Sequence, residues 1–475
     1  MQSDGDRVWA WEEFRRLEVD DERLRPRTMR MVRRAMERGG GRISEVFCDA
    51  AERQGAYDLL EGARVSGEAL MASMSAACVE RGDDGEFVLI PIDGSNIRVV
   101  DRDKRTDLGL VGTYTNNARG LQVVSALAVT EHGTPLGLCA QTWWTRSTKK
   151  KPRSHSTYRP VHERESRYTV WTIQDALRSY SQSKCKPWIV VDRGGDATVI
   201  LDELVRSRAR FTVRCSWNRC VGNRNTQAKL RGVLANQRVQ AHYTVHVPPG
   251  HKRKERLARV AVRRASVELN LKHDWQAKRS NPTLNVLWIH ESRPPHGEKP
   301  LDWMLYTNSP IETVNDMLRV VHSYTMRWRI EDFHKTWKSG HCRVEEIRLR
   351  SAAAVRTWAT LLAAVATRIE RLKHLARTEP DLAATVELSD IELDALKLLK
   401  RQQKKKTEVV GDGVPTIAVA VRWIADLGGY TGKSSGGPPG ATTIGRGLED
   451  LAVAARVLSM VRENPKEFGL ARMKR

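Results

Sequence analysis

Residues 324–340 read YTMRWRIEDFHKTWKSG, and the spacing of their side chains predicts an amphipathic helix. At about 100° per residue, four polar side chains fall within an arc of about 60°: Tyr324, Arg327, Glu331 and Lys338. Nearly opposite lie four apolar side chains: Met326, Ile330, Phe333 and Trp337. We expect the apolar face to pack on a core and the polar stripe to face water or a ligand. The simplest alternative is a solvated helix with an Arg327–Glu331 pair.

The composition of the chain indicates a polyanionic partner. The 475 residues include 80 Lys plus Arg against 57 Asp plus Glu, which gives a formal net charge of +23. Such a field attracts phosphates, and their neutralisation releases condensed counterions. Nucleic acid is therefore the expected partner. A solubility device or a membrane-surface binder is the alternative, but the basic residues are spread along the whole chain rather than gathered in one tail.

The cysteine count and the hydropathy of the chain indicate the cellular compartment of the protein. Seven cysteines without a recognisable signal peptide predict reduced thiols and a cytoplasmic protein. Cys215 and Cys220 lack a second Cys or His pair at zinc-finger spacing, so structural zinc is not expected. The most apolar helical stretch, residues 357–367, is too short to span a bilayer, and we expect no membrane segment.

A second polar stripe is expected near the N-terminus, in a segment that reads as helical to about residue 75. Its arginines step by four and three residues and share one helical face: Arg23, Arg27, Arg30, Arg34 and Arg38. An ordinary solvated face would intersperse acids among such cations, so this face is expected to contact DNA.

Strand-like runs dominate the chain after residue 86. They are β-branched or apolar segments separated by Gly, Pro and charged turns, at 87–93, 95–101, 121–130, 135–144, 187–192 and 210–217. An expected helix at 165–183 interrupts them, which favours a mixed α/β sheet.

The later segments complete the expected organisation. A different strand-rich block at 220–300 predicts an inserted β subdomain, and a long Ala-rich helix is expected at about 351–377. Residues 447–461 predict an amphipathic helix whose apolar strip either dimerises or packs on the chain's own core.

Two of the predicted core strands end in an aspartate, at Asp93 and Asp192. For either residue alone, a turn former or helix cap is the commoner explanation. Together with Glu331 they would supply three hard oxygen ligands of the kind that Mg²⁺ prefers. If the three converge, two ions about 4 Å apart would suit phosphodiester chemistry. Arg327 and Lys338 would then hold the flanking phosphates.

The spacing of Tyr324, Arg327, Glu331 and Lys338 resembles the Y-(2)-R-(3)-E-(6)-K signature of cut-and-paste DDE transposases. The similarity is to the insertion-sequence-four group, and most closely to its transposon-five-like members. Further matching segments occur in the family's order: QGAYDLL at 54–60, PIDGSN at 91–96, VVDRGGD at 190–196, RFTVR at 210–214, LDWMLYT at 301–307 and RWIADLGGY at 422–430.

This resemblance implies an α/β fold with an RNase H-like mixed-sheet catalytic core, an inserted β subdomain, and all-α N-terminal and C-terminal regions. The expected division is a helical DNA-binding domain at 1–75, core segments at 76–219 and 301–378, the β subdomain at 220–300, and a helical dimerisation region at 379–475.

The resemblance also implies the site. Asp93, Asp192 and Glu331 would be the catalytic residues and the ligands of two Mg²⁺ ions, for which Mn²⁺ would substitute. DNA contacts are expected from Tyr324, Arg327, Lys335, Lys338, Arg214, Trp303 and Trp328, and from the N-terminal Arg23, Arg27, Arg30 and Arg34. The two tryptophans fall where similar enzymes handle a flipped base during hairpin formation, although from sequence alone each would more often be a core residue.

The implied activity is that of a transposase acting as a homodimer in a synaptic complex. It would bind transposon ends, cut both strands through a hairpin, and join the 3′ ends to double-stranded target DNA. One alternative is an RNase H-like nuclease without strand transfer, which would need neither the N-terminal arginine helix nor the C-terminal apolar helix. The other is a catalytically idle DNA-binding regulator, which the presence of all three acids disfavours.

Two positions depart from the family pattern. Gly94 follows the first acid where the family commonly has Thr or Ser, and Gly194 stands where the family commonly has a Glu. A missing carboxylate beside the triad is expected to alter metal affinity without removing a ligand. Asp196 is the nearby acid of interest.

Overall fold

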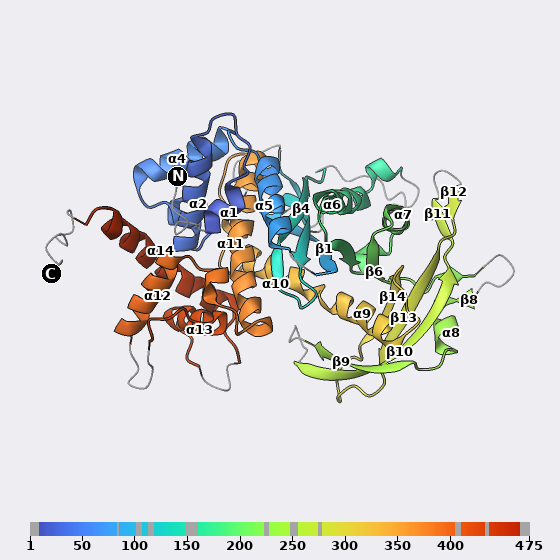
Figure 1. The fold of residues 1–475 in the computed structure, drawn as a ribbon. Coiled ribbons are helices and arrows are strands. Elements are labelled where there is room, and N and C mark those ends of the chain that lie inside the picture. Colours follow the sequence, from blue (N-terminus) through green and yellow to red (C-terminus); the bar gives the residue numbers. More distant parts are fainter. Residues whose placement is uncertain are drawn as a thin grey trace.

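The computed structural model describes residues 9–82, 85–100, 107–112, 118–147, 160–222, 228–247, 255–273, 278–403, 410–432 and 437–465 (Figure 1). The ends of the predicted terminal domains, residues 1–8 and 466–475, lie outside this part. The N-terminal helices and the C-terminal helices gather at one end of the molecule, and the longest strands extend to the other end.

Five helices form the N-terminal region: α1 (Trp9–Phe14), α2 (Leu24–Glu37), α3 (Ile43–Val46), α4 (Ala50–Glu61) and α5 (Gly67–Arg81). The side chains of Asp49 and Ser66 cap α4 and α5, each accepting a hydrogen bond from a backbone N–H in the first turn. Helix α5 packs on strand β4 and on helix α11, so the N-terminal helices are joined to the core.

The described strands form one ten-stranded mixed sheet in the order β2-β3-β1-β5-β6-β14-β13-β10-β9, with β4 paired to β3. Their bounds are β1 (Phe87–Arg98), β2 (Gly109–Leu110), β3 (Arg119–Val129), β4 (Pro135–Trp144), β5 (Lys186–Val191), β6 (Arg210–Arg214), β9 (Ala241–Val247), β10 (Arg256–Glu268), β13 (Thr283–Glu291) and β14 (Asp302–Thr307). Two short pairs lie apart from it: β7 (Cys220–Val221) with β8 (Ala228–Lys229), and β11 (Leu271–His273) with β12 (Lys278–Ser280).

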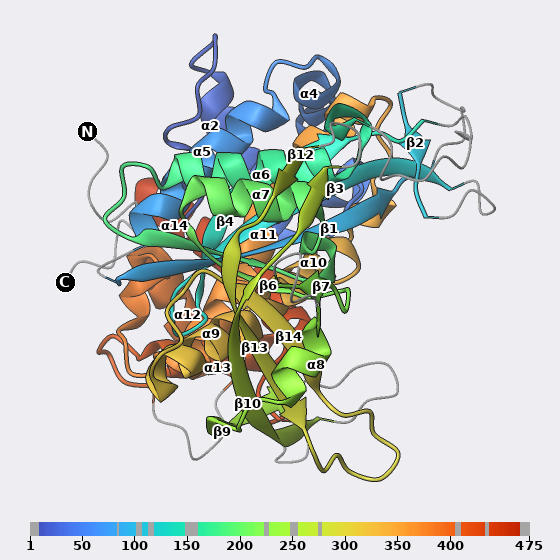
Figure 2. The same cartoon turned by 90° about the vertical axis from the view of Figure 1, so that its right-hand side faces the viewer.

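Strands β1, β5 and β6 are parallel, and they form the centre of the sheet. Alternate residues of β1 point to opposite faces, which separates two apolar cores. Val88, Ile90 and Ile92 pack with α6 (Ser166–Ser179) and α7 (Thr198–Ser207), which lie side by side in Figure 2. Phe87 and Leu89 belong to the core on the other face. The predicted α/β fold with an RNase H-like mixed-sheet core is confirmed.

Most of the block predicted as an inserted β subdomain belongs to the central sheet, and only its short pairs β7–β8 and β11–β12 form separate two-stranded sheets. Its long strands β9, β10 and β13 extend the central sheet, because β13 pairs with β14 from Asn285↔Thr307 to His290↔Asp302. A short helix, α8 (Leu230–Ala235), packs on β10. The segments 87–93 and 95–101, expected as two strands, are one strand to Arg98, since Gly94 and Ser95 stay in register with β3.

The helix expected over 324–340 is two helices, α9 (Val314–Thr325) and α10 (Trp328–Lys338). Between them the backbone bonds are of the tighter three-residue kind, such as Arg327 N–H to the Tyr324 carbonyl at 3.1 Å. Tyr324 therefore belongs to α9 and is only 4% exposed, so its expected place on a water-facing stripe is wrong.

The apolar face expected for this segment is present. Its four residues are buried in the core: Met326, Ile330, Phe333 and Trp337. Helix α10 packs on β1 and β3 on one side and on the long helix α11 (Ala352–Thr378) on the other. This packing places the helix that contains Glu331 against β1, the strand that contains Asp93.

The C-terminal region consists of α12 (Asp390–Gln402), α13 (Ile417–Leu427) and α14 (Ala441–Glu463). Leu448, Leu451 and Ala455 of α14 are buried, and the helix packs on α12, α13 and the N-terminal α2. The apolar strip predicted here thus covers the chain's own core. No helix in the described part of the chain is both long enough and apolar enough to cross a membrane.

Candidate active site

The sheet brings Asp93 and Asp192 together at one edge. Strands β1 and β5 run parallel, and their last paired residues before the acids are Ile92 and Val191. Each aspartate is the next residue: Asp93 lies within β1, which continues to Arg98, and Asp192 directly follows the end of β5. The strand end predicted at Asp93 is therefore wrong, whereas the one predicted at Asp192 is present. Both acids line a pocket of about 500 Å³. This is the edge at which the carboxyl ends of parallel strands place ligand sites in open α/β sheets.

Backbone amides orient both carboxylates. Asp192 begins the short 3₁₀ turn Arg193–Gly195, and its Oδ1 accepts a hydrogen bond from Gly194 N–H at 2.7 Å. Asp93 Oδ1 accepts from Gly94 N–H at 2.9 Å. A Cβ on residue 194 would lie 3.0 Å from Asp192 Oδ1, so Gly194 leaves room for a close backbone approach. The two departures from the family pattern therefore occur where backbone N–H groups hold the acids.

Glu331, on α10, lies close enough to Asp93 for the two charges to interact. Its side chain is about half exposed at 51% and pairs with Arg327 one turn earlier. The pKa of Asp93 is raised to about 6, chiefly by burial and then by the charge of Asp192; Glu331 adds to the rise, and Arg327 opposes it. The three acids are thus close enough to repel one another, a situation that a bound cation relieves.

The cations expected along α10 have different surroundings. Arg327 is mostly buried beside Glu331. Lys338 is half-buried, with its Nζ 3.5 Å from Glu345 Oε1, and Lys335 is exposed. Arg327 is therefore part of the acid cluster itself, whereas the two lysines lie nearer to solvent.

Four of the expected DNA-contact residues form one cluster beside Arg327. The ring of Trp303, on β14, lies 5.0 Å from the ring of Tyr324 and 5.9 Å from that of Trp328. Burial raises the pKa of Tyr324, and the charge of Arg214 opposes this rise. Trp303 is buried and Trp328 is half-buried, so the accessible part of this aromatic cluster belongs to Trp328.

The Asp196 carboxylate is held by three residues that follow β6. Its Oδ2 accepts the backbone N–H groups of Ser216 at 2.7 Å and Trp217 at 3.0 Å, and its Oδ1 pairs with Arg219 at 2.8 Å. The carboxylate is fully buried among these partners. Asp196 therefore fixes the loop after β6 and does not point to the acid pair as a further ligand.

His334 is a site residue that sequence reasoning missed. Its Nδ1 lies 3.7 Å from Asp93 Oδ2, and the side chain is buried. Burial, with a smaller effect of Lys338, lowers the pKa of His334 to about 3, so the imidazole is neutral. Its position three residues after Glu331 was the available signal, because residues three apart on a helix share a face.

Three family models match this chain, and together they cover most of it. "Transposase DNA-binding" matches residues 6–65, "Transposase DDE domain" matches residues 88–368, and "Transposase Tn5 dimerisation domain" matches residues 364–464. The DDE match alone spans more than half of the chain. The chain belongs to the DDE transposases. It is a Tn5-like member of the insertion-sequence-four family, a metal-dependent polynucleotidyl transferase and endonuclease that binds DNA and forms dimers.

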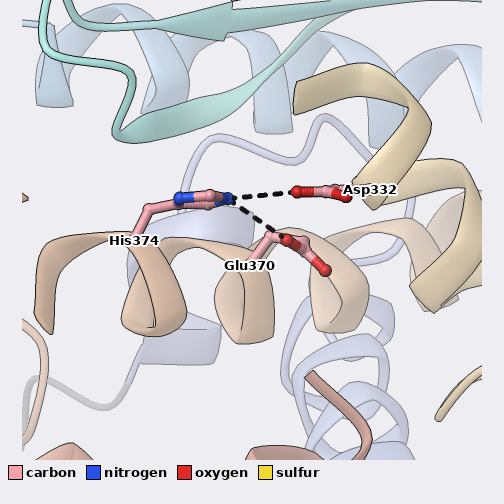
Figure 3. Close-up of side chains that lie close together, drawn as sticks. All are labelled: Asp332, Glu370 and His374. Carbon is pink, nitrogen blue, oxygen red and sulfur yellow. Dashed lines mark ion pairs between the residues drawn. The ribbon is translucent and has the colours of Figure 1, made fainter. Parts of the chain in front are cut away.

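In this transposase the most compact group of potential metal ligands in the described residues is not the DDE triad. Asp332, Glu370 and His374 bring one ligand atom each within 4.8 Å of the others (Figure 3). Lys373 Nζ lies 3.2 Å from Asp332 Oδ2 and also pairs with Glu370, so an ammonium already occupies the space between the carboxylates. Although burial raises it, His374 and Lys373 hold the pKa of Asp332 below its ordinary value.

The arginines expected to form one DNA-facing stripe on the transposase are divided by the fold. Arg34 pairs with Glu37 at 2.6 Å and with Glu52 of α4 at 2.7 Å, and Arg27 donates to the Gly55 carbonyl at 2.5 Å. The exposed members are Arg23, Arg30 and Arg38. The expectation of a face free of acids is wrong at Arg34, because α4 supplies an acid from elsewhere in the chain.

Proposed function

We propose that this transposase cuts both DNA strands at transposon ends through a hairpin and joins the 3′ ends to target DNA within a homodimeric synaptic complex. In this proposal Asp93, Asp192 and Glu331 hold two Mg²⁺ ions, for which Mn²⁺ substitutes. The observation that carries the proposal is the adjacency of Asp93 and Asp192 on parallel strands, with the Glu331 helix packed on the same sheet.

The donor set fits hard divalent cations. Asp93 has a raised pKa because it is buried beside Asp192, and both carboxylates are oriented by backbone N–H groups. A pair of oriented, mutually repelling carboxylates favours a cation. The three carboxylates would hold the ions, whose chemistry would be to activate the attacking water or 3′-hydroxyl and to stabilise the leaving oxygen of the phosphodiester.

The remaining side chains position the DNA in this proposal. Arg327 and Lys338 hold phosphates next to the scissile one, and Lys335 and Arg214 add positive charge along the strand. Tyr324 positions Trp303 and Arg214, because its buried ring packs on Trp303 and its hydroxyl interacts with Arg214. Trp328 offers the accessible ring on which an extruded base would stack, with Trp303 behind it.

Each segment of the chain is proposed to have a separate role. Residues 1–75 read the transposon end, residues 76–219 and 301–378 perform the chemistry, residues 220–300 extend the sheet beside the DNA, and residues 379–475 dimerise. Because the substrate is DNA, we place the transposase at the nucleoid of a bacterial cell.

The proposal is tested with the element's own end DNA and Mg²⁺ on a denaturing gel. Asp93→Ala, Asp192→Ala and Glu331→Ala are each expected to abolish nicks, hairpins and joined products, while a gel shift without metal gives end binding close to wild type. Nicking by any of the three variants contradicts the triad. Nicking by the wild type without joining of pre-cut 3′ ends would instead favour a nuclease without strand transfer.

The hairpin step has its own test. Trp303→Ala is expected to leave first-strand nicking in place while the hairpin product falls, because the accessible ring of Trp328 would lose the Trp303 ring packed behind it. Trp303→Phe keeps an aromatic ring and serves as the control for packing. Normal hairpin yield from a folded Trp303→Ala protein would make Trp303 a core residue only.

A further inference from the structure

A buried charge cluster joins α10 to α11 at the residue next to Glu331. Lys373 Nζ lies 3.2 Å from Asp332 Oδ2 and pairs with Glu370 as well. His374 Nε2 lies 3.5 Å from Asp332 Oδ2 and 3.6 Å from Glu370 Oε2, and Figure 3 shows its ring directed at both carboxylates. Thr336, one turn after Asp332, donates its hydroxyl to Glu370.

The cluster is built in the interior of the protein. Glu370 is 1% exposed and His374 3%, and Lys373 and Thr336 are also buried, whereas the Asp332 side chain reaches the surface and is 42% exposed. Charges removed from water in this way are tolerated only where partners meet them at short range, so the cluster has few alternative geometries. A directional network of this kind fixes the relation of two helices more narrowly than apolar packing does, since the hydrophobic effect has no direction.

The helices that carry the cluster belong to different parts of the transposase. Asp332 and Thr336 lie on α10, inside the region matched by the DDE domain, residues 88–368. Glu370, Lys373 and His374 lie on α11, beyond that match and inside the dimerisation match, residues 364–464. The cluster therefore joins α10 to the part of α11 where the chain passes from the DDE match into the dimerisation match.

Because Asp332 is the residue next to Glu331, a movement of α10 relative to α11 displaces both side chains. A rotation of α10 by one residue, about 100°, or a slide along α11 by one turn, would separate Asp332 from Lys373. The same movement would shift Glu331 relative to Asp93 and Asp192. The apolar face of α10 also opposes large movements, since Ile330, Phe333 and Trp337 are fully buried and Trp337 Nε1 donates a hydrogen bond to the Ala359 carbonyl of α11 at 2.8 Å. The charge cluster adds a second set of directional contacts between the same two helices, beside Glu331.

We propose that Asp332, Glu370, Lys373 and His374 are positioning residues that set the place of Glu331 by locking α10 onto α11, the helix that runs from the DDE match into the dimerisation match. The inference rests on the proposed role of Glu331 and extends it: the geometry of the active site depends on the contact between these two helices. None of the four residues touches the DNA or the metal ions in this proposal.

Lys373→Met is the principal test, because it removes the cation that bridges the two helices. Cleavage of end DNA is measured against Mg²⁺ concentration. The concentration that gives half-maximal cleavage is expected to rise about 10-fold or more, the range typical for groups that orient a metal ligand. End binding without metal should stay at the wild-type value. If Lys373→Met folds poorly, Glu370→Gln replaces it as the test, because Gln keeps the side-chain shape. This variant should also raise the Mg²⁺ concentration that gives half-maximal cleavage.

The matched control is Arg368→Met. Arg368 is another buried cation of α11, but it pairs with Glu392 of α12 at 2.7 Å and not with α10. This variant should lose thermal stability as Lys373→Met does, yet keep the wild-type Mg²⁺ requirement. An unchanged requirement in folded Lys373→Met, or an equal change in Arg368→Met, overturns the inference.

A comparison with Glu331→Ala separates this inference from the proposed function. If Glu331→Ala still cleaves, the triad itself is wrong. If Glu331→Ala is inactive while Lys373→Met and Glu370→Gln require Mg²⁺ as the wild type does, the triad stands and only the positioning role is refuted.

Discussion

Asp93 is held where its ionised form is disfavoured. It is largely buried, it adjoins Asp192, and its pKa rises to about 6 as a result. Its backbone bond from Gly94 and the charge of Arg327 offset only part of this effect. A carboxylate in such a place destabilises the metal-free protein, and a bound cation recovers that free energy.

Asp93→Asn is therefore expected to stabilise the metal-free protein at pH 8. A native pKa near 6 against an ordinary value of 3.8 corresponds to about 2–3 kcal/mol of unfolding free energy. Because the folded state holds the proton more tightly than the unfolded state, wild-type stability from this group is highest at low pH and is lost as pH rises to 6. The gain from Asn should shrink as pH falls from 6 towards 4.

Urea unfolding of both proteins in EDTA at several pH values measures this difference. Saturating Mg²⁺ should reduce the advantage of the Asn variant. An advantage that is the same at every pH would show that burial and the Asp192 charge do not raise the Asp93 pKa.

Arg327 and Lys338 can be separated from ordinary surface cations by kinetics. A charge-assisted phosphate contact in a partly desolvated site is worth about 1.5–3 kcal/mol, so Arg327→Ala and Lys338→Ala should each slow cleavage or joining about 10-fold or more. Arg319→Ala, which removes an exposed arginine of α9, is the control and should leave both steps unchanged. Wild-type rates from Arg327→Ala and Lys338→Ala would make both residues structural.

At the scale of helices and strands, packing determines which basic residues remain exposed for DNA. On α2, Arg30 is exposed, whereas Arg34 is paired with Glu37 and with Glu52 of α4. The two arginines are four residues apart on one helical face, yet the packing of α4 gives them different surroundings. Tyr324 and Glu331 also have different surroundings, because the turn between α9 and α10 places them on different helices.

Arg30→Glu and Arg34→Glu should consequently fail in different ways. Arg30→Glu is expected to weaken end binding by about 10-fold at fixed salt while the melting temperature stays unchanged, because it opposes DNA phosphates from an exposed position. Arg34→Glu is expected to lower the unfolding free energy by about 2–4 kcal/mol, because three acids would then meet in a partly buried place. Gel-shift titration and thermal unfolding of both variants test this, and equal melting temperatures would contradict it.

At the scale of the whole molecule, the described residues leave one face of α14 exposed. Leu448, Leu451 and Ala455 pack on the chain's own helices, while Val453, Val457 and Met460 are about 38–47% exposed. The exposed three lie four and three residues apart and so share a face. Since this helix lies in the matched dimerisation domain, we expect these residues to meet a second copy of the chain.

A charge on this face should oppose dimer formation. Val457→Glu would bring a desolvated carboxylate into an apolar contact and is expected to weaken the dimer on end DNA by about 10-fold or more. Light scattering of the DNA complex over a range of protein concentrations measures the change. Arg462→Ala, about 140° around the helix from Val457 and exposed, is the control. A dimer of wild-type strength from Val457→Glu would place the interface elsewhere.

The sequence by itself determined the chemistry of the parts. Alternating apolar residues predicted the strands, the net charge predicted DNA, and the positions of Asp93, Asp192 and Glu331 after or within apolar patterns marked the acids. These features are local or compositional. A period of two or of 3.6 residues shows which side of an element is apolar, whatever it packs against.

Only the tertiary structure decided what lies beside what. The parallel register of β1 and β5 makes Asp93 and Asp192 neighbours, β13 joins the later strands to the central sheet, and Glu52 reaches Arg34 from another helix. Asp332 meets Lys373 for the same reason. Such contacts join residues distant along the chain, and local patterns do not encode them, because the free energy that selects a partner is gained only when the two elements pack together.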